Sequence, residues 1–149
     1  MTSKLNTPCV GICSTGIGDE VCRGCKRFAH EVIAWNSYSD DQRAAVWRRL
    51  EDLHALISRH WFDIVDQQLL LERMRSHQLR FNLALDPHCW IQDLLKAGAR
   101  QITDLSLYGL RLQPRARGMT LLEIKEAMDQ EFFILSCAHY ERYFAGRTL

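Results

Sequence analysis

The sequence predicts a mostly helical α+β protein, with a four-cysteine metal knuckle resting on a helical pair and a small strand–helix–strand–helix segment after it. Three observations support this prediction. Four of the six cysteines lie between Cys9 and Cys25, in a segment poor in large apolar residues. Several later stretches repeat apolar residues every three or four positions, as amphipathic helices do. Two short stretches, 79–85 and 104–113, alternate with the two-residue period of strands.

The composition of the 149-residue chain is that of a globular protein, with 47% hydrophobic and 25% charged residues. The formal net charge of +1 is lower than that of most strong polyanion binders. No stretch approaches the ~20 apolar residues of a membrane span, and the first ten residues lack the apolar run of a secretory signal. We therefore expect a cytoplasmic protein whose thiols stay reduced, and no membrane partner.

The first helices follow from apolar spacing and capping signals. Residues 26–35 place Phe28, Val32 and Trp35 on one face, which predicts a short helix. Ser39 with Gln42 forms a capping box that starts a helix running to about residue 60. The composition of residues 62–78 predicts a further helix after a kink.

The remaining elements mix strands and helices. We expect a strand at 79–85, and then a helix that begins at Asp86-Pro87 and ends at Gly98. A second strand at 104–113 is interrupted by a bulge or turn at Gly109. A long helix follows from Thr120, which forms a capping box with Glu123, to about residue 144. Two strands alone are marginal, so they must pack on the helices or on a second copy of the protein.

This order of elements predicts two regions. Residues 1–60 form a four-cysteine metal-binding module with two helices. Residues 61–149 form a mainly helical α+β region.

The cysteines follow the pattern C-x3-C-x8-C-x2-C, formed by Cys9, Cys13, Cys22 and Cys25. Four thiolates satisfy a tetrahedral zinc site, and they satisfy an iron–sulfur cluster equally well. A segment with so few apolar residues needs another source of order, which metal binding can supply. We expect zinc in a closed structural site, with an iron–sulfur cluster as the alternative.

Residues around the second cysteine pair suit such a site. Gly24 gives the C-x2-C turn the freedom to point backbone amides at the sulfurs. Arg23, Lys26 and Arg27 would offset the negative charge of a tetrathiolate centre.

The stretches PCVGICSTG, GDEVCRGCKRFAHEVIAW and SDDQRAAVWRRL resemble a small bacterial family of unknown function, the YdhL-like family, whose members are labelled predicted Fe–S proteins. Its motif has the form PC-x3-C, then C-x-GC-x-R, then E-(I/V)-x-x-W, and an acidic-capped helix ending in W-x-R-L. The resemblance covers about residues 7–60 and implies a metal-binding role without an established reaction. The matching positions are Pro8, Cys9, Cys13, Cys22, Gly24, Cys25, Arg27, Glu31, Trp35, Arg43, Trp47, Arg49 and Leu50.

Two basic stretches could bind a polyanion. One contains Arg73, Arg75 and Arg80, and the other contains Arg111, Arg115 and Arg117. If both face the same way as Arg23, Lys26 and Arg27, these nine residues form a surface for a nucleic acid or another partner. Two separate solvated segments are the interpretation that we favour.

A second metal site from His88, Cys89, Cys137 and His139 is an alternative to ordinary packing. Both cysteines lie in apolar helices, where a cysteine behaves as a small buried hydrophobe, and this is the interpretation that we favour. The sequence contains no Gly-rich phosphate loop, no H-E-x-x-H and no nucleophile elbow.

These observations favour a non-enzymatic, metal-binding interaction or adaptor protein whose α+β region docks another protein. An Fe–S electron-transfer or redox-sensing protein is the first alternative. A zinc-dependent RNA-binding protein is the second.

Overall fold

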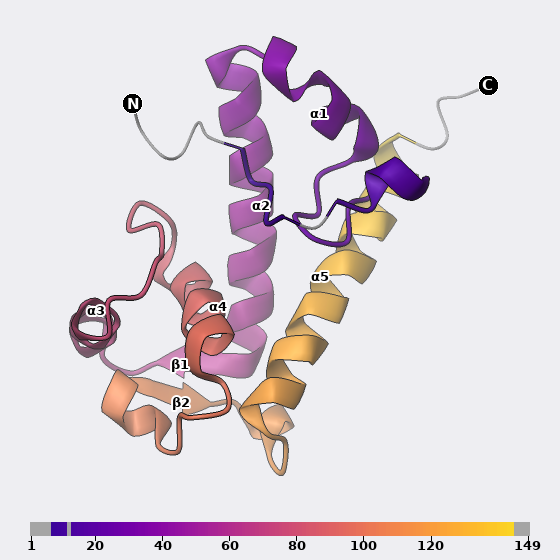
Figure 1. Cartoon of the computed structure of the whole chain (residues 1–149). Helices are drawn as coiled ribbons and strands as arrows, with labels where there is room; N and C mark the ends of the chain where they lie inside the picture. The colour runs from indigo at the N-terminus through magenta and orange to yellow at the C-terminus, as the bar shows by residue number, and fades with distance from the viewer. Residues whose placement is uncertain (1–6, 12, 145–149) are drawn as a thin grey trace. The chain divides into compact units, whose positions relative to one another are not determined.

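The structure, a computed structural model, describes residues 7–11 and 13–144. The chain divides into two compact units, one formed by Met1–Leu50 with Gln130–Leu149 and the other by Glu51–Asp129. This division differs from the predicted boundary at residue 60, because the end of the last helix returns to the first unit (Figure 1). The elements are mostly helical, with a two-stranded sheet, which confirms the predicted fold class.

The first unit begins with the cysteine segment and continues into helices. Helix α1, Ala29–Ala34, runs into a 3-10 turn at Trp35–Ser37, close to the predicted helix at 26–35. Helix α2, Asp40–Trp61, starts at the predicted capping box. There the Ser39 N–H donates to Gln42 Oε1 at 2.8 Å, and the Gln42 N–H donates to Ser39 Oγ at 3.2 Å.

The core of this unit joins three parts of the chain. Buried Trp35, Val46 and Leu50 form a cluster, on which Tyr38, Trp47 and Phe132 pack. Phe132 belongs to the last helix, α5, Leu121–Tyr143. The first unit is therefore completed by residues that are about 80 positions away in sequence.

The second unit contains the sheet. Strand β1, Phe62–Ile64, pairs antiparallel with β2, Leu110–Leu112, in the register Phe62–Leu112, Asp63–Arg111 and Ile64–Leu110. Helix α3, Gln67–Ser76, and helix α4, Pro87–Gly98, lie between the strands in sequence. The predicted helix at 62–78 is thus wrong at its start, because residues 62–64 pair with a distant strand.

The predicted strand at 79–85 is wrong. Asn82 organises a turn there: its side chain accepts the Ala84 N–H at 3.0 Å, and its carbonyl accepts the Leu85 N–H at 3.1 Å. The same carbonyl accepts the Trp90 indole N–H at 3.0 Å. Because these contacts use the backbone groups that a strand would pair, the alternating leucines do not join the sheet.

The second predicted strand, 104–113, forms only in its last part. Asp104 caps a 3-10 turn at Leu105–Tyr108, where its side chain accepts the Ser106 N–H at 3.0 Å. The predicted turn at Gly109 is confirmed: Gly109 has φ +69°. Its carbonyl accepts the N–H groups of Val65 at 2.7 Å and Asp66 at 3.1 Å, which anchors the segment after β1.

The helix starts at Asp86-Pro87 and at Thr120 are confirmed. Asp86 accepts the His88 N–H at 2.8 Å, and α4 ends at Gly98 as predicted. The Thr120–Glu123 capping box forms, with hydrogen bonds of 2.9 and 3.1 Å. The buried hydrophobic residues of the second unit are Ala55, Ile57, Trp61, Phe62, Leu70, Met74, Cys89, Trp90, Ile91, Leu94, Leu95, Leu110, Ala116, Ile124 and Met128.

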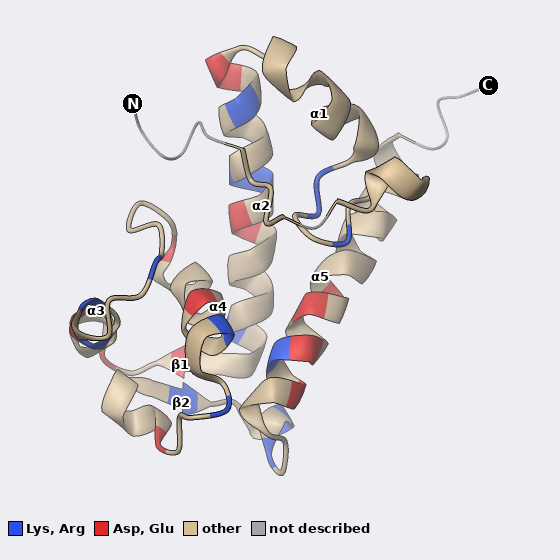
Figure 2. Ribbon diagram, viewed as in Figure 1, with Lys and Arg blue, Asp and Glu red and all other residues tan. Residues whose placement is uncertain are grey.

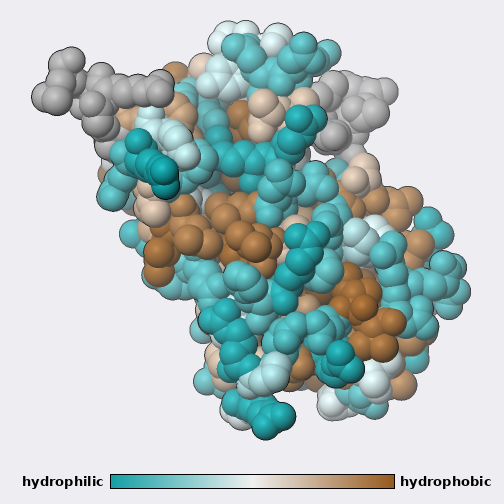
Figure 3. Space-filling model, turned by 180° about the vertical axis from the view of Figure 1, so that it is seen from behind, coloured by the Kyte–Doolittle hydropathy of each residue, from teal (hydrophilic) through white to brown (hydrophobic). Residues whose placement is uncertain are grey.

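Charged and apolar residues both reach the surface. Lys/Arg and Asp/Glu are interspersed along α2 and α5 (Figure 2). Hydrophobic side chains also appear on the face shown in Figure 3, between hydrophilic ones. Within residues 7–11 and 13–144, no helix combines the length and the apolar character needed to cross a membrane.

Candidate metal centre

Cys22 and Cys25 lie on a tight turn held at both ends by backbone hydrogen bonds. The Lys26 N–H donates to the Cys22 carbonyl at 2.9 Å, and the Cys22 N–H donates to the Arg27 carbonyl at 2.8 Å. An isolated antiparallel bridge between Val21 and Phe28 closes the base of the turn. Both cysteines are buried, with exposed fractions of 0% for Cys22 and 7% for Cys25.

The sulfur of Cys22 is surrounded by hydrogen-bond donors. Burial acts to raise the pKa of this thiol. Hydrogen bonds from the backbone N–H groups of Cys25, Ser14 and Gly24, and from the Cys25 side chain, act in the opposite direction and lower its pKa to about 7. Such N–H groups pointing at one sulfur favour the thiolate, which is the form that binds metal.

Cys25 has a different environment. Burial raises the pKa of its thiol, partly offset by Arg27, whose Nε donates to Cys25 Sγ at 3.3 Å. Arg27 also places its guanidinium carbon 5.0 Å from the centre of the Trp35 ring. A buried cation thus lies beside the second sulfur of the turn, where it can compensate thiolate charge.

Cys9 and Cys13 are exposed and have local partners. Cys9 Sγ accepts the Gly11 N–H at 3.4 Å, and Cys13 Sγ lies 3.1 Å from Thr15 Oγ1. All six cysteines are among the described residues, and none of them forms a disulfide. In the part of the chain that the structure describes, no three His, Cys, Asp or Glu side chains converge to hold a metal ion. The structure therefore brings together Cys22 and Cys25, and leaves Cys9 and Cys13 apart from them.

Lys26 and Arg27 are buried, with exposed fractions of 2% and 4%, which corrects the prediction that they belong to an exposed basic surface. Lys26 adopts φ +67°, uncommon for a residue with a side chain, and its Nζ donates to the carbonyls of Arg23 at 2.5 Å and Gly24 at 3.0 Å. The ammonium group thereby satisfies carbonyls within the cysteine turn. Both cations are therefore buried and stabilise the turn through contacts with its own carbonyl and sulfur atoms.

The other predicted surface arginines have contacts within their own units. Arg23 pairs with Asp19 at 3.3 Å and lies 4.5 Å from the centre of the Phe133 ring. In the second unit, Arg73 Nε donates to the Leu107 carbonyl at 3.0 Å, Arg111 pairs with Asp63 and Arg115 lies over Trp61. The remaining three arginines are all exposed: Arg75, Arg80 and Arg117.

Phe28, which follows the turn, is fully buried among side chains of the first unit. The centre of its ring lies 5.3 Å from that of Tyr140 and 5.1 Å from that of Phe144. Arg49 covers the same ring at 4.1 Å, and Glu31 accepts the Phe28 N–H at 2.9 Å. The cysteine turn is therefore seated on α1, α2 and the end of α5.

The four residues of the alternative second metal site have separate environments. In the second unit, Cys89 is buried and its Sγ donates to the Glu51 carbonyl at 3.6 Å. Burial raises the pKa of this thiol to about 12, which opposes metal binding. His88 Nδ1 lies 3.2 Å from Asp86 Oδ1. In the first unit, His139 stacks on Phe28, and burial raises the pKa of Cys137.

Sequence reasoning missed the role of Ser14. Its Oγ accepts the Arg23 N–H at 2.8 Å, and its backbone supports the Cys22 sulfur. The only signal was its position directly after Cys13 in a glycine- and serine-rich loop. It links the segment that carries the first cysteine pair to the turn that carries the second.

Residues 7–54 match the model of a family described as protein of unknown function (DUF1289). The match covers the cysteine segment, α1 and the first part of α2, and the description names no metal, reaction or partner. Searches of curated proteins and of solved structures return no match.

Proposed function

We propose that this protein is a non-catalytic interaction module, in which Cys9, Cys13, Cys22 and Cys25 bind a structural zinc ion. The observation that carries the proposal is the Cys22–Cys25 turn, whose backbone N–H groups point at the Cys22 sulfur and favour its thiolate. A buried arginine beside Cys25 adds to the same electrostatic preference.

The four thiols are ligands that zinc prefers, but only two of them lie close enough together to share one ion. Cys22 and Cys25 already lie together, whereas Cys9 and Cys13 are exposed on the preceding segment. Metal binding would therefore draw Cys9 and Cys13 onto the preformed turn. Coupling of this kind between binding and local folding is common in small zinc modules.

The docking part of the proposal rests on exposed apolar side chains in the second unit. Val65, Leu83 and Leu107 have exposed fractions of 62%, 50% and 49%. Large exposed apolar residues mark surfaces that other proteins cover when they are grouped. In this proposal, the metal segment stabilises the first unit and the second unit contacts the partner protein.

Elemental analysis and a visible spectrum of protein purified without oxygen test the metal. We expect about one zinc per chain and no visible absorption from a fourfold-thiolate site. A brown protein with iron and sulfide would overturn zinc in favour of the Fe–S alternative. Cys22→Ser should lose the metal, and Cys89→Ala should keep it. Retention of metal by Cys22→Ser would refute the site.

The docking surface needs a separate measurement. We expect Leu83→Asp and Leu107→Asp to reduce recovery of the protein's partner from its own cells while leaving metal content unchanged. Arg75→Gln, an exposed change in the same unit, is the matched control. Equal recovery with all three variants would contradict a docking role for these side chains.

A further inference from the structure

A hollow of about 510 Å³ opens beside the sheet of the second unit. It is lined by Arg59 at the end of α2, by Phe62–Val65 around β1, by His88 on α4 and by Arg111 on β2. The volume falls in the range of small-molecule sites. Its lining combines an apolar part from Ile64 and Val65 with two guanidinium groups, an imidazole and the Asp63 carboxylate. The oxygens of Asp63 are occupied, because they accept hydrogen bonds from Arg111 and Gln113.

The two arginines are held in place by carboxylates. Arg59 Nη2 contacts Asp86 Oδ2 at 2.6 Å, and Arg111 Nη2 contacts Asp63 Oδ2 at 3.0 Å. A guanidinium has five N–H donors, so each of these contacts leaves most donors to other acceptors. The side chains of Arg59 and Arg111 are 50% and 70% exposed, so a solute can reach them.

His88 is oriented by the same Asp86. The carboxylate accepts the His88 backbone N–H at 2.8 Å, and its Oδ1 lies 3.2 Å from His88 Nδ1. Because a carboxylate oxygen only accepts, the ring proton belongs on Nδ1, and Nε2 carries the lone pair. Burial lowers the pKa of His88, which agrees with a neutral ring at neutral pH. Nε2 can therefore accept a hydrogen bond.

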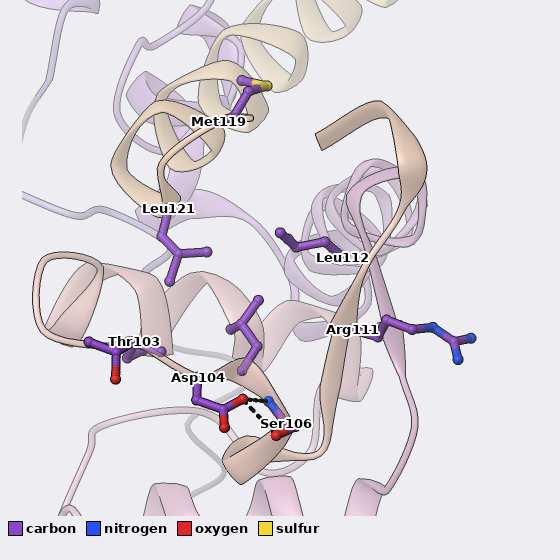
Figure 4. Close-up of a pocket in the computed structure, with 9 residues that line it drawn as sticks. Thr103, Asp104, Ser106, Arg111, Leu112, Met119 and Leu121 are labelled. Carbon is purple, nitrogen blue, oxygen red and sulfur yellow. Dashed lines mark hydrogen bonds between the residues drawn. The ribbon is translucent and has the colours of Figure 1, made fainter. Parts of the chain in front are cut away.

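A second hollow in the same unit, of about 410 Å³, has fewer polar groups available to bind a ligand. Leu112 and Leu121 point into it, and its acidic residue Asp104 is hydrogen-bonded to Ser106 (Figure 4). The Arg111 side chain points away from the apolar interior of that hollow in the same view. The polar groups Asp104 and Ser106 are thus occupied with one another.

We propose that the hollow lined by Arg59, His88 and Arg111 binds a small organic carboxylate that also carries a hydroxyl group and a short apolar body. The carboxylate pairs with the two guanidinium groups, the hydroxyl donates to His88 Nε2, and the apolar body lies against Ile64 and Val65. This site is independent of the cysteine segment and of the metal.

Amide NMR titration with mandelate tests the proposal, because mandelate has all three features. We expect saturable shifts at Ile64, Val65, His88 and Arg111. Phenylacetate, which lacks the hydroxyl, should bind at least about threefold more weakly, and neutral mandelamide should not saturate. An absence of saturable shifts at these amides, or equal binding of mandelamide, would overturn the proposal.

Variants assign the roles. Arg59→Gln and Arg111→Gln should each lower the affinity for mandelate at least about fivefold, while Arg75→Gln should leave this affinity unchanged. Because Arg59→Lys keeps the charge, its affinity for mandelate should lie between those of wild type and Arg59→Gln. In His88→Phe, mandelate and phenylacetate should bind equally. A loss of affinity in Arg75→Gln equal to that in Arg111→Gln, or a hydroxyl preference that survives His88→Phe, would refute the assigned contacts.

Discussion

The carboxylate of Glu31 and the guanidinium of Arg49 meet in two parallel hydrogen bonds, Oε2–Nη1 at 2.5 Å and Oε1–Nη2 at 2.6 Å. This pair joins α1 to α2 within the first unit. The same carboxylate accepts the Phe28 N–H, and the same guanidinium covers the Phe28 ring. The two residues thus fix the position of the chain directly after the cysteine turn.

Arg49→Met should destabilise the first unit by about 2–4 kcal/mol, because it leaves the buried Glu31 carboxylate without its cation. Arg49→Lys should cost less, since it keeps the charge and loses the paired geometry. Urea unfolding followed by tryptophan fluorescence measures both effects. The control is Arg48→Met at the neighbouring position, which should change stability by less than about 0.5 kcal/mol. Equal effects at positions 48 and 49 would show that the pair is not stabilising.

Gly109→Ala should be strongly destabilising to the second unit. A Cβ at Gly109 would lie 2.2 Å from the Asp66 carbonyl oxygen, and the residue has φ +69°. Gly118 also has a positive φ, +79°, but a Cβ there would meet no atom within 4 Å, so Gly118→Ala isolates the conformational cost. We expect about 1 kcal/mol for Gly118→Ala and about 3 kcal/mol or more for Gly109→Ala. Similar thermal unfolding of the two variants would contradict the close approach.

Local signals predicted the helix starts well and long-range pairing poorly. The capping pairs Ser39–Gln42 and Thr120–Glu123 act over three residues, so the sequence around them contains the whole cause. Strand β1 is three residues long, and its partner is almost fifty positions away. Its neighbours favour helix, and only the tertiary contact makes it a strand.

The candidate site shows the same contrast. The C-x2-C spacing predicted the Cys22–Cys25 turn, because two intervening residues suffice to close it. The burial of Lys26 and Arg27 was missed, since it depends on partners in the turn and on Trp35. A charged residue is normally predicted to be exposed. This prediction fails where a cation pairs with buried carbonyls or with a sulfur.

Removal of the proposed zinc ion should affect the two cysteine pairs unequally. Because the Cys22–Cys25 turn already has its backbone hydrogen bonds, its amides should stay protected from hydrogen exchange when a chelator is added. Amides of residues 7–11 and 13 should lose protection, since Cys9 and Cys13 have only local contacts. Exchange of α4 amides is the internal control. If amides around both cysteine pairs lost equal protection from exchange, the Cys22–Cys25 turn would not be formed before metal binding.

Asp93 makes stability depend on pH. Burial raises the pKa of this carboxyl on α4 to about 6, partly offset by Lys96. The folded state therefore keeps a proton that the unfolded chain has already released, so this contribution is complete at low pH and is lost as pH rises through about 6. Asp93→Asn should raise stability at pH ~7.5, relative to pH ~4.5, by about 2 kcal/mol compared with wild type. Parallel pH profiles for the two proteins would refute this assignment.

Tyr140→Ala should weaken the packing around Phe28, which holds the cysteine turn in place. Tyr140 lies near the other end of the chain. Its ring packs edge-on against Phe28, and its hydroxyl is hydrogen-bonded to Glu20, whose carbonyl accepts the Ala29 N–H at 2.8 Å. Loss of these contacts should destabilise the first unit and speed exchange of the Ala29 amide. Tyr143→Ala is the matched control, because Tyr143 is 45% exposed on the same helix. If both variants left Ala29 equally protected, α5 would not stabilise the turn, and residues 7–54 would be expected to fold without it.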